Sequence, residues 1–296
     1  MFDVPSCDTA PCALQQHWCF AAALRACGHD VVWLEAVAPL LVLHRRLAGL
    51  AVAMLSRAKI ECPHLLGDQL REAGLHRHLI LLSPEQPTPK LAQIGAVPLM
   101  TPGFVAHIDL TPAQDVRRAG LHQKWRNRLV YGEGQGLQIR RQNLPLKADH
   151  WLLLADAVQQ SNRGYRNWPV PLTLAFAREN PSSAKLFTAF EGREAVAAML
   201  FLRHGTRATY HIGHITARGR ALCAHNLLLW QATRWLAAQG HTSVELGLID
   251  TRNAPGLARF KLGAGASVHK LGGTWGWWPP MGRMLRLLAG LDRRQM

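Results

Sequence analysis

The stretch of sequence that decides the fold runs from Leu200 to Trp278. It reads TYHIG over 209–213, TARGR over 216–220, an apolar run over 224–238, VELG over 244–247 and GLARFK over 256–261. This order predicts a strand, a basic glycine loop, a long helix that stops at Gly240, a second strand and a short helix. A basic loop that leads into a helix N-terminus presents free backbone N–H groups and the positive end of the helix dipole. The stretch therefore predicts an anion site, for which the phosphates of an acyl donor are one suitable ligand.

The composition indicates a folded and strongly basic protein. Hydrophobic residues make up 48% of the 296 residues, which argues against a disordered chain, and the length allows one large domain or two ordinary ones. The formal net charge is +15. This excess predicts attraction to nucleic acid, to an anionic lipid surface or to a phosphorylated substrate, although a basic surface can also serve solubility alone.

The cysteines and the N-terminus indicate a protein of the cytoplasm. No two of the six cysteines have the C-x-x-C spacing of zinc or redox sites, so we expect no metal and reduced thiols. A charged segment followed by an apolar core is absent from the N-terminus, which argues against a signal peptide. The apolar run near Leu40 is too short to span a bilayer.

The order of the predicted elements repeats along the chain. The first half contains β-branched and apolar runs that predict strands over 31–34, 40–43, 50–55, 79–82 and 104–110, with helices over 15–26 and 65–73. The second half predicts a strand over 137–141, a helix over 148–162, a hairpin over 186–203 and a further strand over 207–215. We therefore expect an α/β (α+β) fold with two domains, 1–110 and 137–296, each a mixed, mostly antiparallel sheet flanked by helices.

A long basic helix is predicted between the two halves, over 111–136. Thr111 suits the N-cap and Pro112 the first helical position. Residues spaced by four would form its buried stripe: Leu121, Trp125 and Leu129. The helix carries almost no acidic residues, so ion pairs within it do not explain its charge. Lys124 and Arg128 are therefore candidates for contact with a ligand, unless they simply form a solvated face.

Three segments of the chain resemble the GNAT acyltransferase superfamily. They are the basic stretch 121–127, the turn 190–193 with the strand 196–200 after it, and the segment 256–263. Their order resembles the branch with two fused GNAT-like domains, which includes the Fem family of non-ribosomal aminoacyl transferases and related acetyltransferase-like proteins. The resemblance implies an N-acyltransferase with two tandem GNAT-like domains, in which an acceptor amine attacks the acyl donor directly.

The resemblance also implies where the donor would bind. The acyl group would lie between two splayed strands, 208–215 and 244–248, where a backbone N–H polarises its carbonyl. The donor phosphates would be held by three loop residues, Arg218, Gly219 and Arg220. Phe260 would lie beside them. No tightly bound cofactor is expected, because the donor is a co-substrate.

The identity of the donor depends on how far the loop departs from the acetyl-CoA pattern. Aligned on Arg218, the glycine positions of that pattern are Ala221 and Cys223, and this weakens a close approach of the backbone to a pyrophosphate. The loop of the Fem branch is likewise degenerate, and its donor is an aminoacyl-tRNA. A charge of +15 suits such a donor, so aminoacyl-tRNA is slightly favoured over acyl-CoA.

Three residues are candidates for catalysis. The resemblance implies that Lys261 stabilises the charged tetrahedral intermediate; the alternative is a lysine on an exposed helix. His211 and Glu245 are candidate general bases. The alternatives are a structural histidine and an exposed carboxylate at a sheet edge.

The acceptor is predicted less sharply. Arg166 lies in a basic and aromatic segment, 163–168, that suits a base, a phosphate or a lid loop. Asp250 and Asn253 follow a predicted strand and could hold an amine. Lys124 and Arg128 of the basic helix are further candidates for contact with the acceptor. A cell-wall precursor, a small amine, a lipid head group and a peptide all fit. The tail 281–294 is a basic amphipathic segment that could touch an anionic membrane or pack on its own protein. A catalytically inactive module that binds RNA or an anionic surface is the alternative function.

Overall fold

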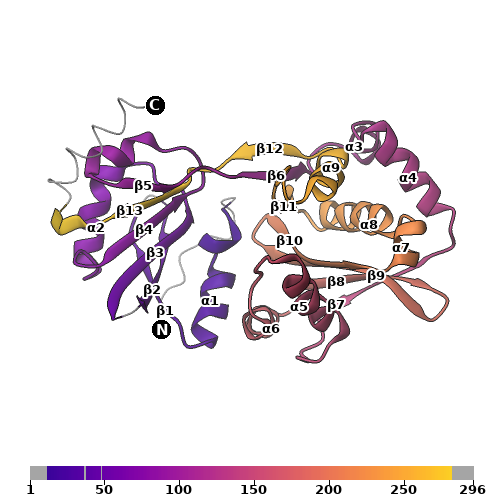
Figure 1. Ribbon diagram of the computed structural model, residues 1–296, viewed down its shortest axis with the longest axis horizontal. Coiled ribbons are helices and arrows are strands. Elements are labelled where there is room, and N and C mark those ends of the chain that lie inside the picture. The colour runs from indigo at the N-terminus through magenta and orange to yellow at the C-terminus, as the bar shows by residue number, and fades with distance from the viewer. Residues whose placement is uncertain (1–11, 37, 48, 282–296) are drawn as a thin grey trace. The chain divides into compact units, whose positions relative to one another are not determined.

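The computed structural model describes residues 12–36, 38–47 and 49–281, and these residues form two compact units. Of these described residues, those in 12–104 and 269–281 belong to the first unit and those in 105–268 to the second (Figure 1). The second unit is therefore inserted into the first, and the chain passes between them twice. Each unit has its own sheet and its own apolar core.

The first unit is built on a six-stranded sheet in the order β1-β2-β3-β4-β13-β5. Its strands are β1 (Asp30–Leu34), β2 (Leu40–Leu47), β3 (Leu50–Ala58), β4 (Leu79–Pro84), β5 (Val97–Met100) and β13 (Thr274–Trp277). The β3–β4 pair is parallel and the other pairs are antiparallel. Leu55, Ile80 and Leu82 are fully buried in its core, where Leu66 and Leu70 pack against them.

Short helices complete the first unit. They are η1 (Leu14–Gln16), α1 (Trp18–Ala26), η2 (Pro63–Leu65), α2 (Leu66–Glu72), η3 (Pro89–Ile94) and η4 (Pro279–Met281). The buried amide of Gln16 joins η1 to the sheet. Its Nε2 donates to the carbonyls of Leu41 (3.2 Å) and Ser56 (2.7 Å), and its Oε1 accepts from the Leu41 N–H (2.9 Å). One side chain thus satisfies three backbone groups of β2 and β3.

The second unit is built on a seven-stranded sheet in the order β12-β6-β11-β10-β9-β8-β7. Its strands are β6 (Phe104–Asp109), β7 (Gln138–Asn143), β8 (Ala184–Glu191), β9 (Glu194–His204), β10 (Arg207–Ile215), β11 (Ser243–Leu248) and β12 (Ser267–Lys270). The β10–β11 pair is parallel, whereas β7–β8, β8–β9, β9–β10 and β6–β11 are antiparallel.

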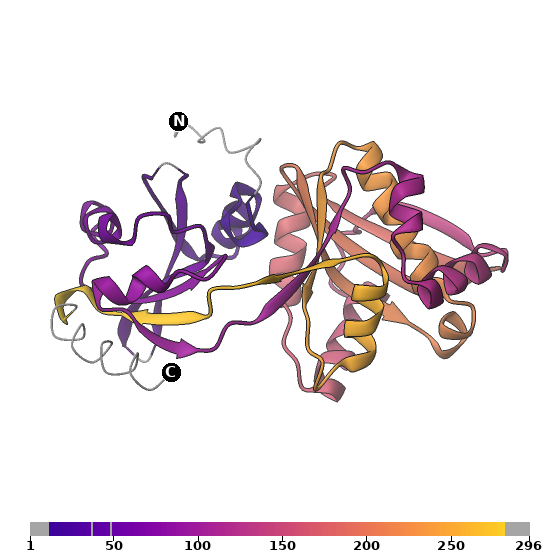
Figure 2. The same cartoon turned by 90° about the horizontal axis from the view of Figure 1, so that it is seen from above.

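Helices cover both faces of this second sheet (Figure 2). They are α3 (Gln114–Ala119), α4 (Gln123–Glu133), α5 (Trp151–Arg163), α6 (Val170–Glu179), α7 (Ala217–Ala221), α8 (Ala224–Ala238) and α9 (Pro255–Gly263). The core packs α8 and α4 on strands β8 and β9. Leu228, Leu236 and Leu129 are fully buried there with Phe201. No helix in the described ranges is both long and apolar enough to cross a bilayer.

The expected domain limits differ from the structure at two places. Strand β13 lies between β4 and β5 in the first sheet, so the end of the chain does not belong with 137–268. The basic segment 111–136 is part of the second unit and does not connect two domains, because Trp125 and Leu129 are buried in that unit's core. The predicted stripe of Leu121, Trp125 and Leu129 is confirmed as buried.

Local structure also differs from three expectations. The basic segment forms two helices instead of one, because His122 caps α4 through its Nδ1 and donates its own N–H to the carbonyl of Gly263 (3.0 Å). The expected basic loop 216–220 contains helix α7, and α6 was not expected. Most of the predicted tail segment, 282–294, lies outside the described residues.

Candidate active site

Strands β10 and β11 of the second unit pair over only part of their length and then separate. The two strands pair in parallel only from Arg207 to Thr209 and from Ser243 to Glu245, although β10 continues to Ile215. Both strands are irregular just beyond these pairs. The register of β10 against β9 shifts between Tyr210 and Ile212, and that of β11 against β6 shifts after Glu245. The splayed strands that the GNAT resemblance predicts are therefore present.

Lys261 reaches the end of β11 from helix α9. Its side chain is almost fully buried, with the residue 5% exposed, and Nζ donates to the carbonyl of Leu248 over 2.6 Å. Burial lowers the pKa of Lys261 to about 8, against the opposing effect of the Glu245 carboxylate. An ammonium has three donors, so two remain, and with this pKa the group is mainly charged at neutral pH. The alternative of a lysine on an exposed helix is wrong.

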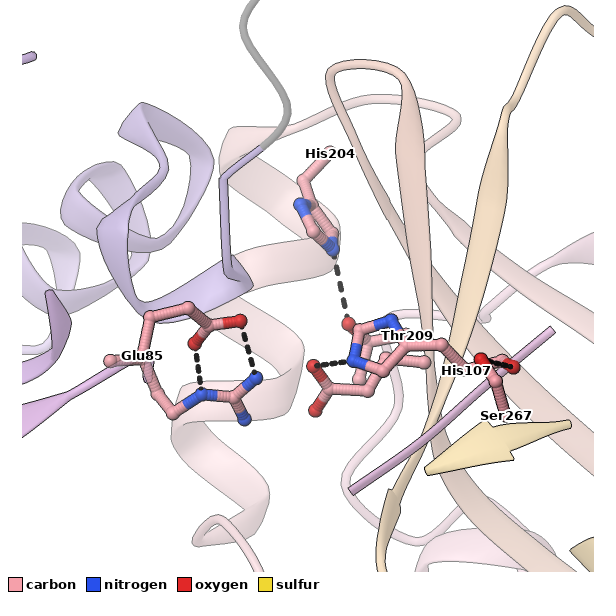
Figure 3. A network of polar contacts seen from close by, with 7 residues as sticks. Glu85, His107, His204, Thr209 and Ser267 are labelled. Atoms are coloured by element: carbon pink, nitrogen blue, oxygen red, sulfur yellow. Dashed lines mark hydrogen bonds and ion pairs between the residues drawn. The ribbon is translucent and has the colours of Figure 1, made fainter. Parts of the chain in front are cut away.

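Glu245 faces a histidine that the sequence did not indicate. The carboxylate Oε2 lies 3.6 Å from Nε2 of His107 on β6, and both side chains are 12% exposed (Figure 3). The two residues are opposite each other in the β6–β11 register. The same view shows the His204–Thr209 hydrogen bond of this sheet. Glu245 also acts on the pKa of Lys261, so the structure brings Lys261, Glu245 and His107 together. The alternative of an exposed carboxylate at a sheet edge is wrong, because the side chain of Glu245 is largely buried.

His211 occupies the bulge of β10 and is held on several sides. Its Nε2 lies 2.9 Å from the hydroxyl of Thr173 on α6, and its ring centroid is 4.7 Å from that of Trp168. Burial lowers the pKa of His211 to about 3. The ring is therefore neutral at physiological pH and is a weak base. This arrangement favours the structural role for His211 over the catalytic one.

The segment after α5 is fixed to the same bulge. Asp156, which is buried, accepts hydrogen bonds from the Tyr165 hydroxyl (2.9 Å) and from Nδ2 of Asn167 (3.3 Å). The Asn167 amide also donates to the carbonyl of His211 (3.3 Å). Arg166 is exposed between these anchored residues. Asp156 and Asn167 were not predicted as site residues, because their partners lie on separate elements.

The expected donor-binding residues lie on α7 and have different surroundings. Arg218 makes a two-pronged ion pair with Glu191, with Nε 2.8 Å from Oε2. Gly219 is buried, and a Cβ at this position would lie 2.3 Å from the carbonyl oxygen of Val196. The glycine is therefore required by close packing on β9. Arg220 is exposed, and its charge contributes to lowering the pKa of His214.

The N-terminus of α8 is the better candidate for an anion site. Its N-cap residue, Cys223, has a left-handed backbone conformation (φ 52°) and no side-chain cap. Arg128 of α4 is close enough to oppose the effect of burial on the Cys223 pKa, and Arg220 acts on the pKa of His225 in the first turn. Two basic residues from different elements thus flank an uncapped helix N-terminus.

Phe260 of α9 was predicted to lie beside the donor. Phe260 packs its ring between Trp125 (5.9 Å between centroids) and His225 (6.2 Å).

Asp250 closes a turn after β11, because it accepts from the backbone N–H and the side-chain amide of Asn253, each at 2.8 Å. These hydrogen bonds lower the pKa of Asp250. Lys124 and Arg128 are exposed on α4. None of these placements tests the predicted contact with an acceptor.

Three solved structures of similar fold cover most of this chain. FemX is 12% identical, with a TM-score of 0.75 over 94% of this chain and 96% of FemX. The C-terminal domain of a protein described as a lysylphosphatidylglycerol synthetase from Agrobacterium fabrum is 14% identical, with a TM-score of 0.56 over 94% and 92%. L-PGS from Bacillus licheniformis is 13% identical, with a TM-score of 0.54 over 97% and 99%. At these identities the likeness shows the fold alone.

Sequence comparison gives the family. Curated proteins provide no match to the chain. The family model of the acetyltransferase (GNAT) domain matches residues 123–270, which include α4, the splayed strands and α9. Since the matched residues make up half of the chain, the protein belongs to the GNAT acetyltransferase family, as a transferase with the fold of its Fem-like branch.

Proposed function

We propose that this protein is an N-acyltransferase in which an acceptor amine attacks an acyl carbonyl held between β10 and β11. The observation that supports this most is the buried ammonium of Lys261 at the end of β11. A cation in a site with little water stabilises a developing oxyanion more than one in solvent does. The arrangement therefore favours a reaction whose negative charge appears only in the transition state.

The reaction forms one bond and breaks one. The amine nitrogen bonds to the acyl carbon, and the carbonyl oxygen carries the negative charge beside Lys261. The bond to the leaving oxygen or sulfur then breaks, and that atom takes up one proton while the amine loses one to a base. Of the two predicted bases Glu245 is better placed, because it lies near Lys261, whereas a pKa of about 3 makes His211 a poor proton acceptor.

The donor carries phosphate, and aminoacyl-tRNA remains slightly favoured over acyl-CoA. Arg128 and Arg220 flank the N-terminus of α8, and the chain has a formal charge of +15. Both features suit a polyanionic donor. Arg218 is the weaker donor contact of the predicted set, because Glu191 already neutralises it. Phe260 and Gly219 would support this site through packing.

The acceptor is proposed only as a class. An amine held near Asp250 and Asn253 would reach the end of β11, with Lys124 and Arg166 as contacts for its anionic groups. Arg128, which the sequence placed among the acceptor contacts, is assigned to the donor instead. One protein of the same fold is named as a lysylphosphatidylglycerol synthetase. A lipid head group at an anionic membrane is therefore an acceptor to test, together with a cell-wall precursor and a small amine. A cytoplasmic location suits both donors.

Transfer assays with matched variants test this proposal. Wild type, Lys261→Met and the control Arg259→Met are offered labelled aminoacyl-tRNA or acetyl-CoA with a panel of amines. Arg259 is exposed on the same helix as Lys261, so its variant controls for surface charge on α9. We expect transfer from one donor by wild type and the control, and a large loss in Lys261→Met. Equal transfer by all three proteins contradicts the role of Lys261. RNA binding without transfer from either donor supports the inactive module instead.

A further inference from the structure

A histidine pair with a carboxylate behind it lies in the first unit, apart from the proposed transferase chemistry. His44 on β2 and His78, just before β4, approach with their Nε2 atoms 3.0 Å apart. The other ring nitrogen of His44, Nδ1, lies 2.9 Å from Oδ2 of Asp30 on β1. The ring centroids of the two histidines are 4.7 Å apart, with the rings at 74° to each other.

The hydrogen-bonding capacity of these groups limits where the protons can lie. An ionised carboxylate only accepts, so Nδ1 of His44 carries the hydrogen and its Nε2 presents a lone pair toward His78. If Nε2 of His78 donates to that lone pair, Nδ1 of His78 is left as an acceptor. That atom is buried and has no hydrogen-bond partner among the described residues. In the other tautomer of His78 the hydrogen is on Nδ1 and Nε2 presents a lone pair toward His44.

With both hydrogens on Nδ1, two lone pairs face each other at Nε2. This arrangement is repulsive unless a cation lies between them. Zinc binds imidazole nitrogen at about 2.0–2.1 Å, so two nitrogens of a tetrahedral site are about 3.3 Å apart. The observed 3.0 Å separation needs to open by only a few tenths of an ångström to reach this geometry.

We propose that His44 and His78 bind one divalent transition-metal ion, Zn²⁺ or Cu²⁺, through their Nε2 atoms. Asp30 acts behind the site, because a carboxylate on the far nitrogen fixes the tautomer and the orientation of a ligating histidine. Imidazole nitrogens are suited to both metals.

Water molecules would complete the coordination shell of a metal ion bound by His44 and His78. In the described ranges no group of three or more His, Cys, Asp or Glu side chains is arranged for a metal, so this is a two-histidine site. The ligands are 34 positions apart in sequence and Asp30 lies 14 before His44, spacings that match no metal motif. The open positions would allow a further ligand to bind the ion.

Calorimetric titration of the untagged, metal-free full chain with ZnCl₂ near neutral pH tests the proposal. We expect one saturable site in wild type that is lost in both His44→Ala and His78→Ala. Asp30→Asn should weaken binding by about 10- to 100-fold, as expected for a carboxylate behind a ligating histidine. His64→Ala is the matched control, because His64 is an exposed histidine of the same unit, and it should bind like wild type.

Two further readouts keep the test decisive if one variant fails to fold. Zn²⁺ should raise the melting temperature of wild type and of His64→Ala but not of His78→Ala. The electron paramagnetic resonance spectrum with one equivalent of Cu²⁺ should show two equatorial nitrogens in wild type, and this two-nitrogen signal should be absent from either single variant. Unchanged Zn²⁺ affinity in His44→Ala and His78→Ala, or no saturable site in wild type, overturns the proposal and leaves a hydrogen-bonded pair.

Discussion

The ammonium of Lys261 donates a hydrogen bond to the carbonyl oxygen of Leu248 over 2.6 Å, and this contact joins helix α9 to the end of strand β11. It fixes a buried positive charge near the opening between β10 and β11. The carboxylate of Glu245 is close enough to raise the pKa of the same ammonium. The Leu248 carbonyl dipole and the Glu245 carboxylate thus both stabilise the charged form of Lys261. Two of its N–H donors are left for a substrate oxygen.

Lys261→Arg should fold but recover little activity. The planar guanidinium cannot occupy the compact position of the ammonium and still donate to the Leu248 carbonyl in the same geometry. We expect turnover about 100- to 1,000-fold below wild type, the usual effect of losing one oxyanion donor. Steady-state kinetics with the identified donor measures the loss of turnover, and circular dichroism checks the fold. Near-normal turnover would show that charge alone suffices at this position.

Turnover should fall as the pH rises through about 8. The pKa of Lys261 is lowered to about 8 by burial, so the ammonium loses its proton there and the neutral amine no longer stabilises an oxyanion. A pH profile of kcat measures the decline. Lys261→Arg serves as the comparison, because its guanidinium stays charged at every accessible pH and its residual activity should lack this limb. The same alkaline limb in both proteins would assign it to another group.

The same pKa makes a prediction for stability, with the opposite trend. A lysine whose folded pKa is about 8 and whose unfolded pKa is about 10.4 binds its proton more weakly when folded. Below pH 8 the charge therefore costs roughly 3 kcal/mol of folding free energy, and the cost disappears as the pH rises to about 10.4. Urea unfolding should show wild type gaining on Lys261→Met across this window. A constant difference between the two would mean that the pKa is not lowered.

The main elements could be predicted because local patterns determine them. The alternating and apolar runs of β2, β3, β8, β9 and β10 bury their inward residues, and α8 combines an apolar face with a stop before Gly240. Lys261 was found through the resemblance of its segment, and its burial supports that choice. Helix α6 could also have been found, since Pro169 and Pro171 stand at its first turn, where proline is tolerated.

Other features depend on contacts between distant segments and leave no local signal. The break between α3 and α4 involves a hydrogen bond from His122 to Gly263, 141 positions later. Strand β13 enters the first sheet through pairing with β4 and β5. His107 meets Glu245 only because of the β6–β11 register. Such residues become visible only when the sheet order is known.

Donor binding should depend more on Arg220 than on Arg218. Glu191 neutralises Arg218 through two contacts, whereas Arg220 is exposed and near the N-terminus of α8. Arg220→Ala should therefore weaken donor affinity more than Arg218→Ala, and the loss should shrink as salt is raised. Titration of each variant with the identified donor at two ionic strengths measures this. Equal losses, or a larger one for Arg218→Ala, would return the phosphate site to the predicted α7 position.

Gly219→Ala should destabilise the second unit without removing any charge. The added Cβ would lie 2.3 Å from the Val196 carbonyl oxygen and 3.0 Å from Cγ1 of Ile215, so α7 must move away from β9. Overpacking of this kind typically costs about 1–3 kcal/mol. Gly256→Ala is the matched control, because a Cβ there meets no atom within 4 Å. Thermal unfolding of both variants measures the difference. If Gly219→Ala instead melts like wild type and loses only donor affinity, the glycine serves the approach of a ligand, as the resemblance implied, and the packing account fails.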